Sequence, residues 1–275
     1  MPSFAMGLGL HKQRFFGGGF DSDAQAQITR IQNAGGTIED ANIIDADIKF
    51  LKSIGLFNNL KYAVDPRAGI TERVDGSDTF ASKIFDYSGS DADTDNSTGS
   101  EQPKKGILNG ITSLDFDGVN DKLTNENTVT FLGGEEMFSI AVYAQDFDNA
   151  NSPNGQIIDK FSPNAASKNF GERSDSISIF GNEISPTPFQ NVQIIASGTA
   201  TTDNLLTGFI NGVQKGQITD RVDYVGKTLG RIRSSLTFDA FGKGKFQKNW
   251  DFNVLPTPSQ AAAINTYLTN QFNIS

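Results

Sequence analysis

Apolar and polar residues alternate with a period of two along much of the chain, which is the pattern of half-buried β-strands. The clearest example is 112–131, where Leu114 and Phe116 alternate with aspartates. Asp117-Gly118 then provides turn residues, because glycine accepts a positive φ at little cost. The pattern therefore predicts two strands joined by a tight turn, with the apolar side continuing beyond it.

Similar segments recur between turn residues over the rest of the chain. Asn211-Gly212 separates two of them, and this dipeptide favours the type I′ turn of a β-hairpin. The regular spacing predicts a mainly β protein, an antiparallel sandwich over 61–275. The predicted strands are 83–87, 107–116, 119–131, 137–145, 155–161, 176–180, 191–199, 205–211, 213–218 and 228–241.

Helical spacing of apolar residues appears only near the two ends of the chain. Residues 21–60 predict a small helical element of two helices, the first capped by Asp21 or Ser22 and the second by Thr37. A C-terminal helix is predicted to follow Ser259 as its cap.

The first 20 residues are rich in glycine and phenylalanine and predict an extended arm, because three consecutive glycines oppose a helix. Phe15, Phe16 and Phe20 are the candidate assembly residues, since exposed aromatic side chains promote aggregation unless they dock. Two alternatives are that these rings pack on the chain's own helical pair and that the terminus is disordered.

Composition narrows the classes of function. The 275 residues carry a formal charge of −9, and lysine and arginine are scattered, so nucleic acid is not expected as a partner. The absence of cysteine excludes disulfides and thiolate metal sites. The sequence contains no run of about 20 apolar residues, so no membrane insertion is predicted.

The stretch from Leu114 to Leu123 resembles the hairpin of laminin-G-like and concanavalin A-like sandwich domains. Four further segments resemble that family in the same order: 84–89, 138–143, 208–213 and 246–272. The resemblance covers 80–275 and implies a concanavalin A-like jelly roll that recognises surfaces.

The glycine-rich start, the helical pair and the segment from Tyr62 to Pro66 together resemble structural proteins of bacteriophages. This second resemblance implies a non-enzymatic virion component, such as a capsid decoration, fibre or spike, assembled in the host cytoplasm. Its partners would be other virion proteins, further copies of itself and host cell-surface glycans. The alternatives are a carbohydrate-binding module or adhesin, and a glycoside hydrolase of the same fold.

Catalytic and metal signatures are sparse. Retaining glycoside hydrolases of the fold that this chain resembles carry their carboxylates in an E-x-D-x-x-E string, and this string does not occur here. His11 is the only histidine. No enzyme and no cofactor is therefore predicted. Asp91, Asp93 and Asp95 are candidate calcium ligands; a solvated acidic loop is the alternative. Asp115, Asp117 and Asp121 form a second acidic group that turn capping also explains.

Overall fold

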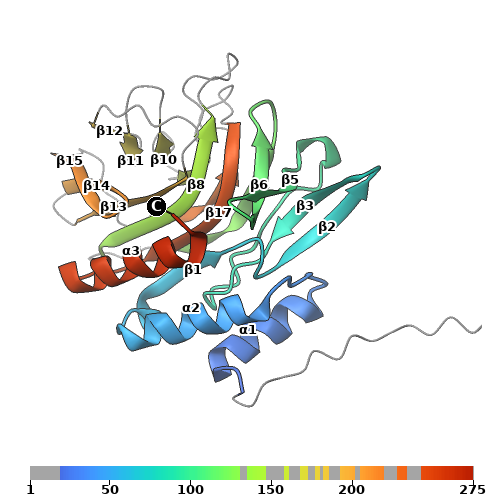
Figure 1. The fold of residues 1–275 in the computed structure, drawn as a ribbon, viewed down its shortest axis with the longest axis horizontal. Coiled ribbons are helices and arrows are strands. Elements are labelled where there is room, and N and C mark those ends of the chain that lie inside the picture. The colour runs from blue at the N-terminus through green and yellow to red at the C-terminus, as the bar shows by residue number, and fades with distance from the viewer. Residues whose placement is uncertain are drawn as a thin grey trace, which may run out of the picture.

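The structure is a computed structural model, in which helices lie along one side of layered β-strands (Figure 1). It describes residues 19–130, 135–146, 158–160, 168–172, 177–179, 182–185, 193–201, 205–219, 228–233 and 243–274. Phe15 and Phe16 lie outside these residues.

Two helices precede the sheet, as predicted. Helix α1 (Ser22–Asn33) begins at Asp21, whose carboxylate accepts a hydrogen bond from the backbone N–H of Asp23. Helix α2 (Ala41–Ser53) is capped by Asp40. The prediction of Thr37 as this cap was wrong, because Thr37 instead pairs with Ile70 in an isolated β-bridge.

A short 3₁₀ turn, η1 (Phe57–Asn59), leads from the helices to the first strand. Helix α3 (Pro258–Phe272) closes the described chain and is capped by Thr257, two residues before the predicted Ser259. The side chains and backbones of Thr257 and Gln260 form a reciprocal capping box. Ser259 already lies inside the first turn of the helix, so it cannot be the N-cap.

Within the described residues the strands form one antiparallel hydrogen-bonded network, which confirms the predicted β-sandwich. β17 is central: β8 runs along one side of it, and β1 and β6 share its other side. The front layer continues from β8 through β13 and β14 to β15. Its strands are β1 (Leu60–Val64), β6 (Ile111–Asp117), β8 (Met137–Asp146), β13 (Ile194–Ala200), β14 (Leu205–Ile210), β15 (Val213–Thr219) and β17 (Lys243–Phe252).

From β6 the network turns through β5 and β3, with β2 at the outer edge of β3, and passes through β4 into the back layer. The connecting strands are β2 (Ile70–Asp75), β3 (Asp78–Ile84), β4 (Thr94–Asp95) and β5 (Lys104–Leu108), and the turn η2 (Gly99–Glu101) lies between the last two. The back layer contains β7 (Lys122–Thr130), β9 (Ile158–Lys160), β10 (Lys168–Glu172), β11 (Ile177–Ile179), β12 (Asn182–Ser185) and β16 (Thr228–Arg233).

Two local predictions about strands need correction. β6 and β7 do not pair with each other: β6 pairs with β5 and β17, whereas β7 pairs with β4 and β16. Asp117-Gly118 therefore joins strands that take different neighbours. The single strand predicted over 107–116 is a hairpin, because Asn109 and Gly110 both adopt positive φ and form its turn.

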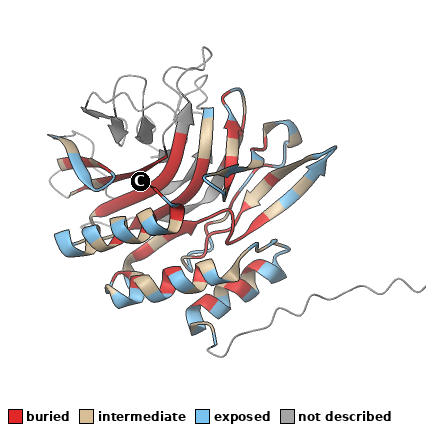
Figure 2. Cartoon of the chain, in the orientation of Figure 1, coloured by how far each residue is buried: buried red, intermediate tan, exposed pale blue. Residues whose placement is uncertain are grey.

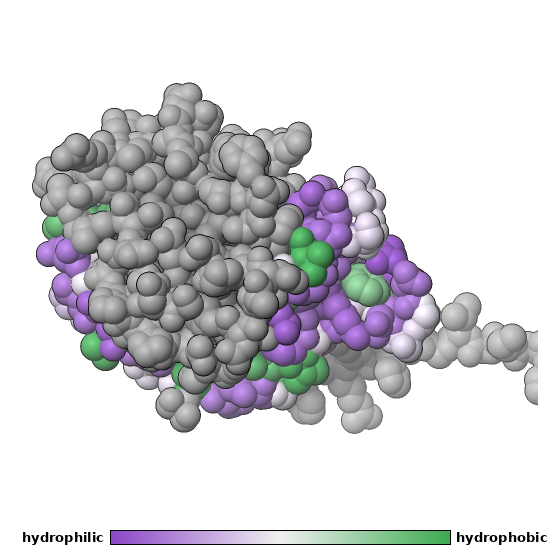
Figure 3. Space-filling model, turned by 90° about the horizontal axis from the view of Figure 1, so that it is seen from above, coloured by the Kyte–Doolittle hydropathy of each residue, from purple (hydrophilic) through white to green (hydrophobic). Residues whose placement is uncertain are grey.

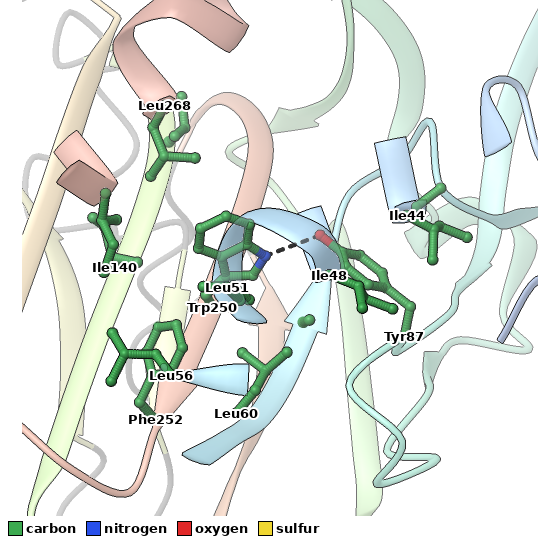
Figure 4. Close-up of a cluster of buried hydrophobic side chains, with 14 of the residues drawn as sticks. Ile44, Ile48, Leu51, Leu56, Leu60, Tyr87, Ile140, Trp250, Phe252 and Leu268 are labelled. Atoms are coloured by element: carbon green, nitrogen blue, oxygen red, sulfur yellow. Dashed lines mark hydrogen bonds between the residues drawn. The ribbon is translucent and has the colours of Figure 1, made fainter. Parts of the chain in front are cut away.

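The central strands of the front layer, β8 and β17, are buried on both faces over most of their length, whereas β15 at its edge is largely exposed (Figure 2). One apolar cluster lies on the side of the back layer and includes Phe116, Tyr143 and Phe246. The other lies between the front layer and the three helices and includes Trp250 and Phe252. In Figure 4 the side chains of α2, β17 and α3 meet around Trp250, whose indole N–H donates to the Tyr87 hydroxyl at 3.0 Å.

Candidate functional site

A groove of about 720 Å³ opens where the β2–β3 hairpin meets β6, the start of β17 and the turn η2. All of the residues that line it belong to the described part of the chain. They are Arg73, Asp75, Asp78, Phe80, Gly99, Ser100, Gln102, Lys104, Asp115, Phe116, Asp117, Asp121 and Lys243. Eight of these thirteen residues are charged and two, Phe80 and Phe116, are aromatic, so the groove is a mainly polar surface feature with some apolar ring surface.

Arg73 organises one wall of this groove. Its guanidinium carbon lies 4.5 Å from the ring centroid of Phe80, and Nη1 donates to Asp75 at 3.1 Å. Nε and Nη2 donate to Gln102 Oε1 at 2.6 Å and to the Gly99 carbonyl at 2.8 Å. The side chain remains 32% exposed, so its outer edge is accessible from the groove.

The loop that accepts the hydrogen bonds of Arg73 is itself held in place by buried polar groups. Gln102 is buried and donates through Nε2 to the carbonyl of Asn96 at 2.7 Å. Asn96 in turn donates through Nδ2 to the carbonyls of Glu101 and Lys122. Because these polar groups hold one another, the groove wall is preorganised rather than formed only when a ligand arrives.

Two of the three aspartates in this acidic group, Asp117 and Asp121, act as turn caps, whereas Asp115 accepts a hydrogen bond from the Ser113 hydroxyl at 2.6 Å. Asp117 accepts hydrogen bonds from the N–H groups of Val119 and Asn120, and Asp121 accepts one from the N–H of Asp117 at 2.8 Å. Burial raises the pKa of Asp121 to about 7, and the carboxylate of Asp117 acts in the same direction; the hydrogen bond from the Asp117 N–H opposes it.

The charges of the groove are partly paired. Lys104 contacts Asp78 at 2.7 Å, and Asp115 pairs with Lys245 at the groove margin. The lining nevertheless contains five carboxyl groups and three cationic groups. This excess favours a neutral or cationic ligand and disfavours an anionic one.

The predicted calcium ligands lie elsewhere and contact cations of the chain itself. Asp91 and Asp93 both contact Arg30, at 2.9 and 3.1 Å, and Asp95 lies 3.8 Å from Lys83. In the described residues no group of three or more histidine, cysteine or acidic side chains is placed to hold a metal ion. Arg30 thus supplies the positive charge beside two of the three carboxylates.

Phe20 is the one predicted assembly residue that the structure describes. It is partly buried and packs against the apolar cluster between the helices and the front layer. This placement corresponds to the alternative in which the ring docks on the chain's own helical pair. The segment of the chain that the structure describes contains no helix long and apolar enough to cross a membrane.

Figure 3 shows the molecule from above, coloured by hydropathy. The described residues seen there are mainly hydrophilic, with hydrophobic residues scattered among them. Among the residues that the structure describes, the large apolar side chains that are exposed are Val74, Ile107, Val119 and Val213.

Comparison with known proteins supports the fold. No family model matches the chain, and no curated protein matches it. Among solved structures, the binding domain of Paraclostridial mosquitocidal protein 1 is similar with a TM-score of 0.53 and 13% identity, covering 78% of this chain and 53% of that one. The botulinum neurotoxin serotype D binding domain gives 0.51 and 15%, covering 79% and 52%.

An α-L-arabinofuranosidase soaked with a cyclic sulfate inhibitor is similar with a TM-score of 0.51 and 12% identity, covering 79% of this chain and 64% of that one. The chain spans between 34% and 64% of the length of the structures it resembles. At these identities the likeness shows the class of fold, an antiparallel β-sandwich, and no particular activity.

Proposed function

We propose that this protein is a non-enzymatic recognition module that binds neutral, hydroxyl-rich glycans in the groove between the β2–β3 hairpin and β6. The observation that carries the proposal is the wall in which Arg73 stacks on Phe80 beside exposed carboxylates. Sugar hydroxyls both donate and accept hydrogen bonds, so they match a surface that offers guanidinium donors and carboxylate acceptors side by side. The Phe80 ring, which lines the groove beside the guanidinium, adds apolar surface next to these polar groups.

The excess of carboxyl groups in the groove favours neutral glycans over acidic ones as the ligand. Sialylated and other acidic glycans would meet unfavourable electrostatics at Asp75 and Asp117, both of which are exposed. Neutral glycans avoid this repulsion. The glycan-processing enzyme among the structural neighbours supports the choice of ligand class only by analogy of fold.

A glycan array with neutral and sialylated oligosaccharides, followed by titration calorimetry, tests the proposal. We expect Arg73→Gln to weaken neutral-glycan binding roughly tenfold, because a charge-assisted hydrogen bond is lost. Lys49→Gln is the matched control: it removes the same charge from the exposed face of α2 and should leave binding unchanged. Binding restricted to acidic glycans, or equal binding by both variants, would refute the groove as the site.

We further propose that the module is displayed on a bacteriophage particle as a homo-oligomer anchored through its N-terminal region. The support is the order of segments in the sequence, in which a glycine-rich start precedes the helical pair and the sandwich. Deletion of residues 1–20 should remove the protein from purified particles while glycan binding by the isolated protein is retained. Particles that retain the shortened chain in full amount would contradict this anchoring.

A glycoside hydrolase is the second candidate function, and one observation favours it. Asp121 is 6% exposed, lines the groove and has a pKa of about 7, which suits a general acid. Incubation with neutral oligosaccharides distinguishes the two functions. Turnover that Asp121→Asn abolishes would establish the hydrolase, whereas binding without any cleavage agrees with the recognition module.

A further inference from the structure

Lys248 of β17 is a buried amine that faces two carboxyl groups from other parts of the chain. Its Nζ lies 2.5 Å from Asp47 Oδ2 on α2 and 3.4 Å from Asp65 Oδ2, just after β1. The lysine side chain is 1% exposed and both aspartate side chains are 0% exposed. Fully buried lysines are rare, because an ammonium group loses its hydration there.

The carboxyl group of Asp47 is surrounded by hydrogen-bond donors. Tyr267 and Gln271, both on α3, donate to Oδ1 at 2.8 and 3.1 Å. The hydroxyl of Tyr87 donates to Oδ2 at 2.7 Å. Donors that are fixed around a carboxyl group in this way stabilise the negative charge that develops on its oxygens when a nucleophile attacks the carbon.

The surroundings exclude water and retain a base. The Nζ of Lys248 lies 4.7 Å from the Trp250 ring centroid and 5.6 Å from that of Phe272. Asp65 accepts hydrogen bonds from Arg67 Nε at 2.9 Å and Nη2 at 2.6 Å. Although burial opposes it, the charges of Arg67 and Lys248 hold the pKa of Asp65 below its ordinary value, so Asp65 is a carboxylate that lies 3.4 Å from the Lys248 ammonium.

We propose that Lys248 and Asp47 join in an intramolecular isopeptide bond, with Asp65 as the proton carrier. Asp65 takes one proton from the Lys248 ammonium and passes it to the Asp47 carboxylate. The neutral amine then attacks Asp47 Cγ, forming the C–N bond. Asp65 takes a second proton from the nitrogen and delivers it to the departing oxygen, so that one water molecule leaves and Asp65 is again a carboxylate. No oxidant or other reactant is needed.

The balance of charge around the bond agrees with this step. Before it, two cations, Lys248 and Arg67, lie with two carboxylates, Asp47 and Asp65. The condensation removes one charge of each sign and leaves the Arg67–Asp65 pair intact. No unpaired ion remains in the interior, which is the outcome that burial penalises most.

The bond would join α2 to β17 across 201 positions of the chain and fasten the helical layer to the front sheet. Because the chain contains no cysteine, no disulfide performs this role. A cross-link over so long a loop stabilises the folded chain by restricting the unfolded one. This inference does not depend on the groove or on its ligand.

Mass spectrometry of the intact, denatured full-length protein tests the proposal directly. We expect a mass lower by one water molecule than the sequence requires, after removal of Met1 is taken into account. Proteolysis should yield one branched peptide that contains both Asp47 and Lys248. Lys248→Arg should show the full mass for its sequence, and Lys49→Arg, which alters an exposed lysine of α2, should keep the deficit.

Two results would overturn the isopeptide bond. One is a wild-type protein with the full mass expected from its sequence. The other is a water deficit carried by a linear peptide, such as one spanning Asp117-Gly118, where an aspartate can cyclise on its own backbone. Asp65→Asn tests the role of the proton carrier, because it keeps both reacting groups and should leave most of the protein unlinked.

Discussion

Replacing Asp121 with asparagine should stabilise the protein at alkaline pH and have less effect at acidic pH. The carboxyl group is 6% exposed and its pKa in the folded protein is about 7, compared with an ordinary value of 3.8. Between these two values the folded protein binds the proton more tightly than the unfolded chain does. Stability therefore falls as the pH rises through this interval, and asparagine, which resembles the protonated acid, removes that loss.

The magnitude follows from the separation of the two values. Each pH unit of difference corresponds to about 1.4 kcal/mol, so ionised Asp121 destabilises the folded state by about 4 kcal/mol at most above pH 8. About 1.5 to 2 kcal/mol of this is already present at pH 5, because the unfolded chain has ionised by then. The advantage of Asp121→Asn should therefore grow by about 2 to 3 kcal/mol between pH 5 and pH 8.

Urea unfolding of the wild type and of Asp121→Asn at several pH values measures this difference. The control is Asp95→Asn, which removes a carboxylate whose side chain is 63% exposed and should shift the unfolding free energy by a similar small amount at every pH. The reasoning fails if the free energies of the wild type and Asp121→Asn change in parallel with pH. It also fails if the advantage shrinks as the pH rises.

Three further substitutions test the packing and the helix caps, each by urea unfolding. Leu51→Ala should cost about 2 to 5 kcal/mol, because Leu51 is 0% exposed and the helical layer cannot fill the cavity; a loss below about 1 kcal/mol would contradict this. Gly36→Ala should cost about 1 to 3 kcal/mol, because its Cβ would lie 2.6 Å from atoms of Ile31 and Phe85; an unchanged midpoint would show that this contact relaxes freely. Thr257→Ala should cost about 1 kcal/mol through the lost capping box, and Thr257→Ser should recover most of it.

Features that depend on neighbouring residues could be predicted from the sequence. Asn211 and Gly212 adopt the positive φ values of the predicted turn, and Asp21 caps α1 as expected. The same Asn-Gly signal occurs at Asn109-Gly110, but the apolar residues on either side of it read as one continuous strand. At this point the turn chemistry outweighs the periodicity, because both residues adopt the left-handed region.

Features that depend on distant partners could not be predicted in this way. Alternation around Asp117-Gly118 correctly indicated strands on both sides of the turn. It carries no information on which strands they pair with. β6 pairs with β17, which begins only at Lys243 and is therefore far away in the sequence. The candidate groove also depends on distant parts of the chain, because its lining combines residues from 73–121 with Lys243.

Strand β17 shows most clearly how tertiary burial overrides local pattern. Its sequence alternates charged and amide residues with aromatic ones, which is typical of a strand with one face in water, although 243–252 is not among the strands predicted from alternation. In the structure every residue from Phe246 to Phe252 is buried: Trp250 and Phe252 face the helices, and Asn249 and Asp251 point to the opposite face, where Asp251 accepts a hydrogen bond from Ser139 at 2.5 Å. The polar members are satisfied individually; Asn249, for example, donates to the carbonyl of Ile140 at 2.9 Å.

This double burial also determines where recognition can occur. A sandwich with a free sheet face could bind a ligand across it, but here the helices occupy one face of the front layer and the back layer occupies the other. Among the described residues, the β2–β3 hairpin and the end of β6 lie beyond the helical cover, and the groove forms there. Arg73 and Phe80 can thus meet a ligand because they lie where the layers end, whereas Lys248, equally polar in sequence, is enclosed by α2 and α3 and can react only with the chain itself.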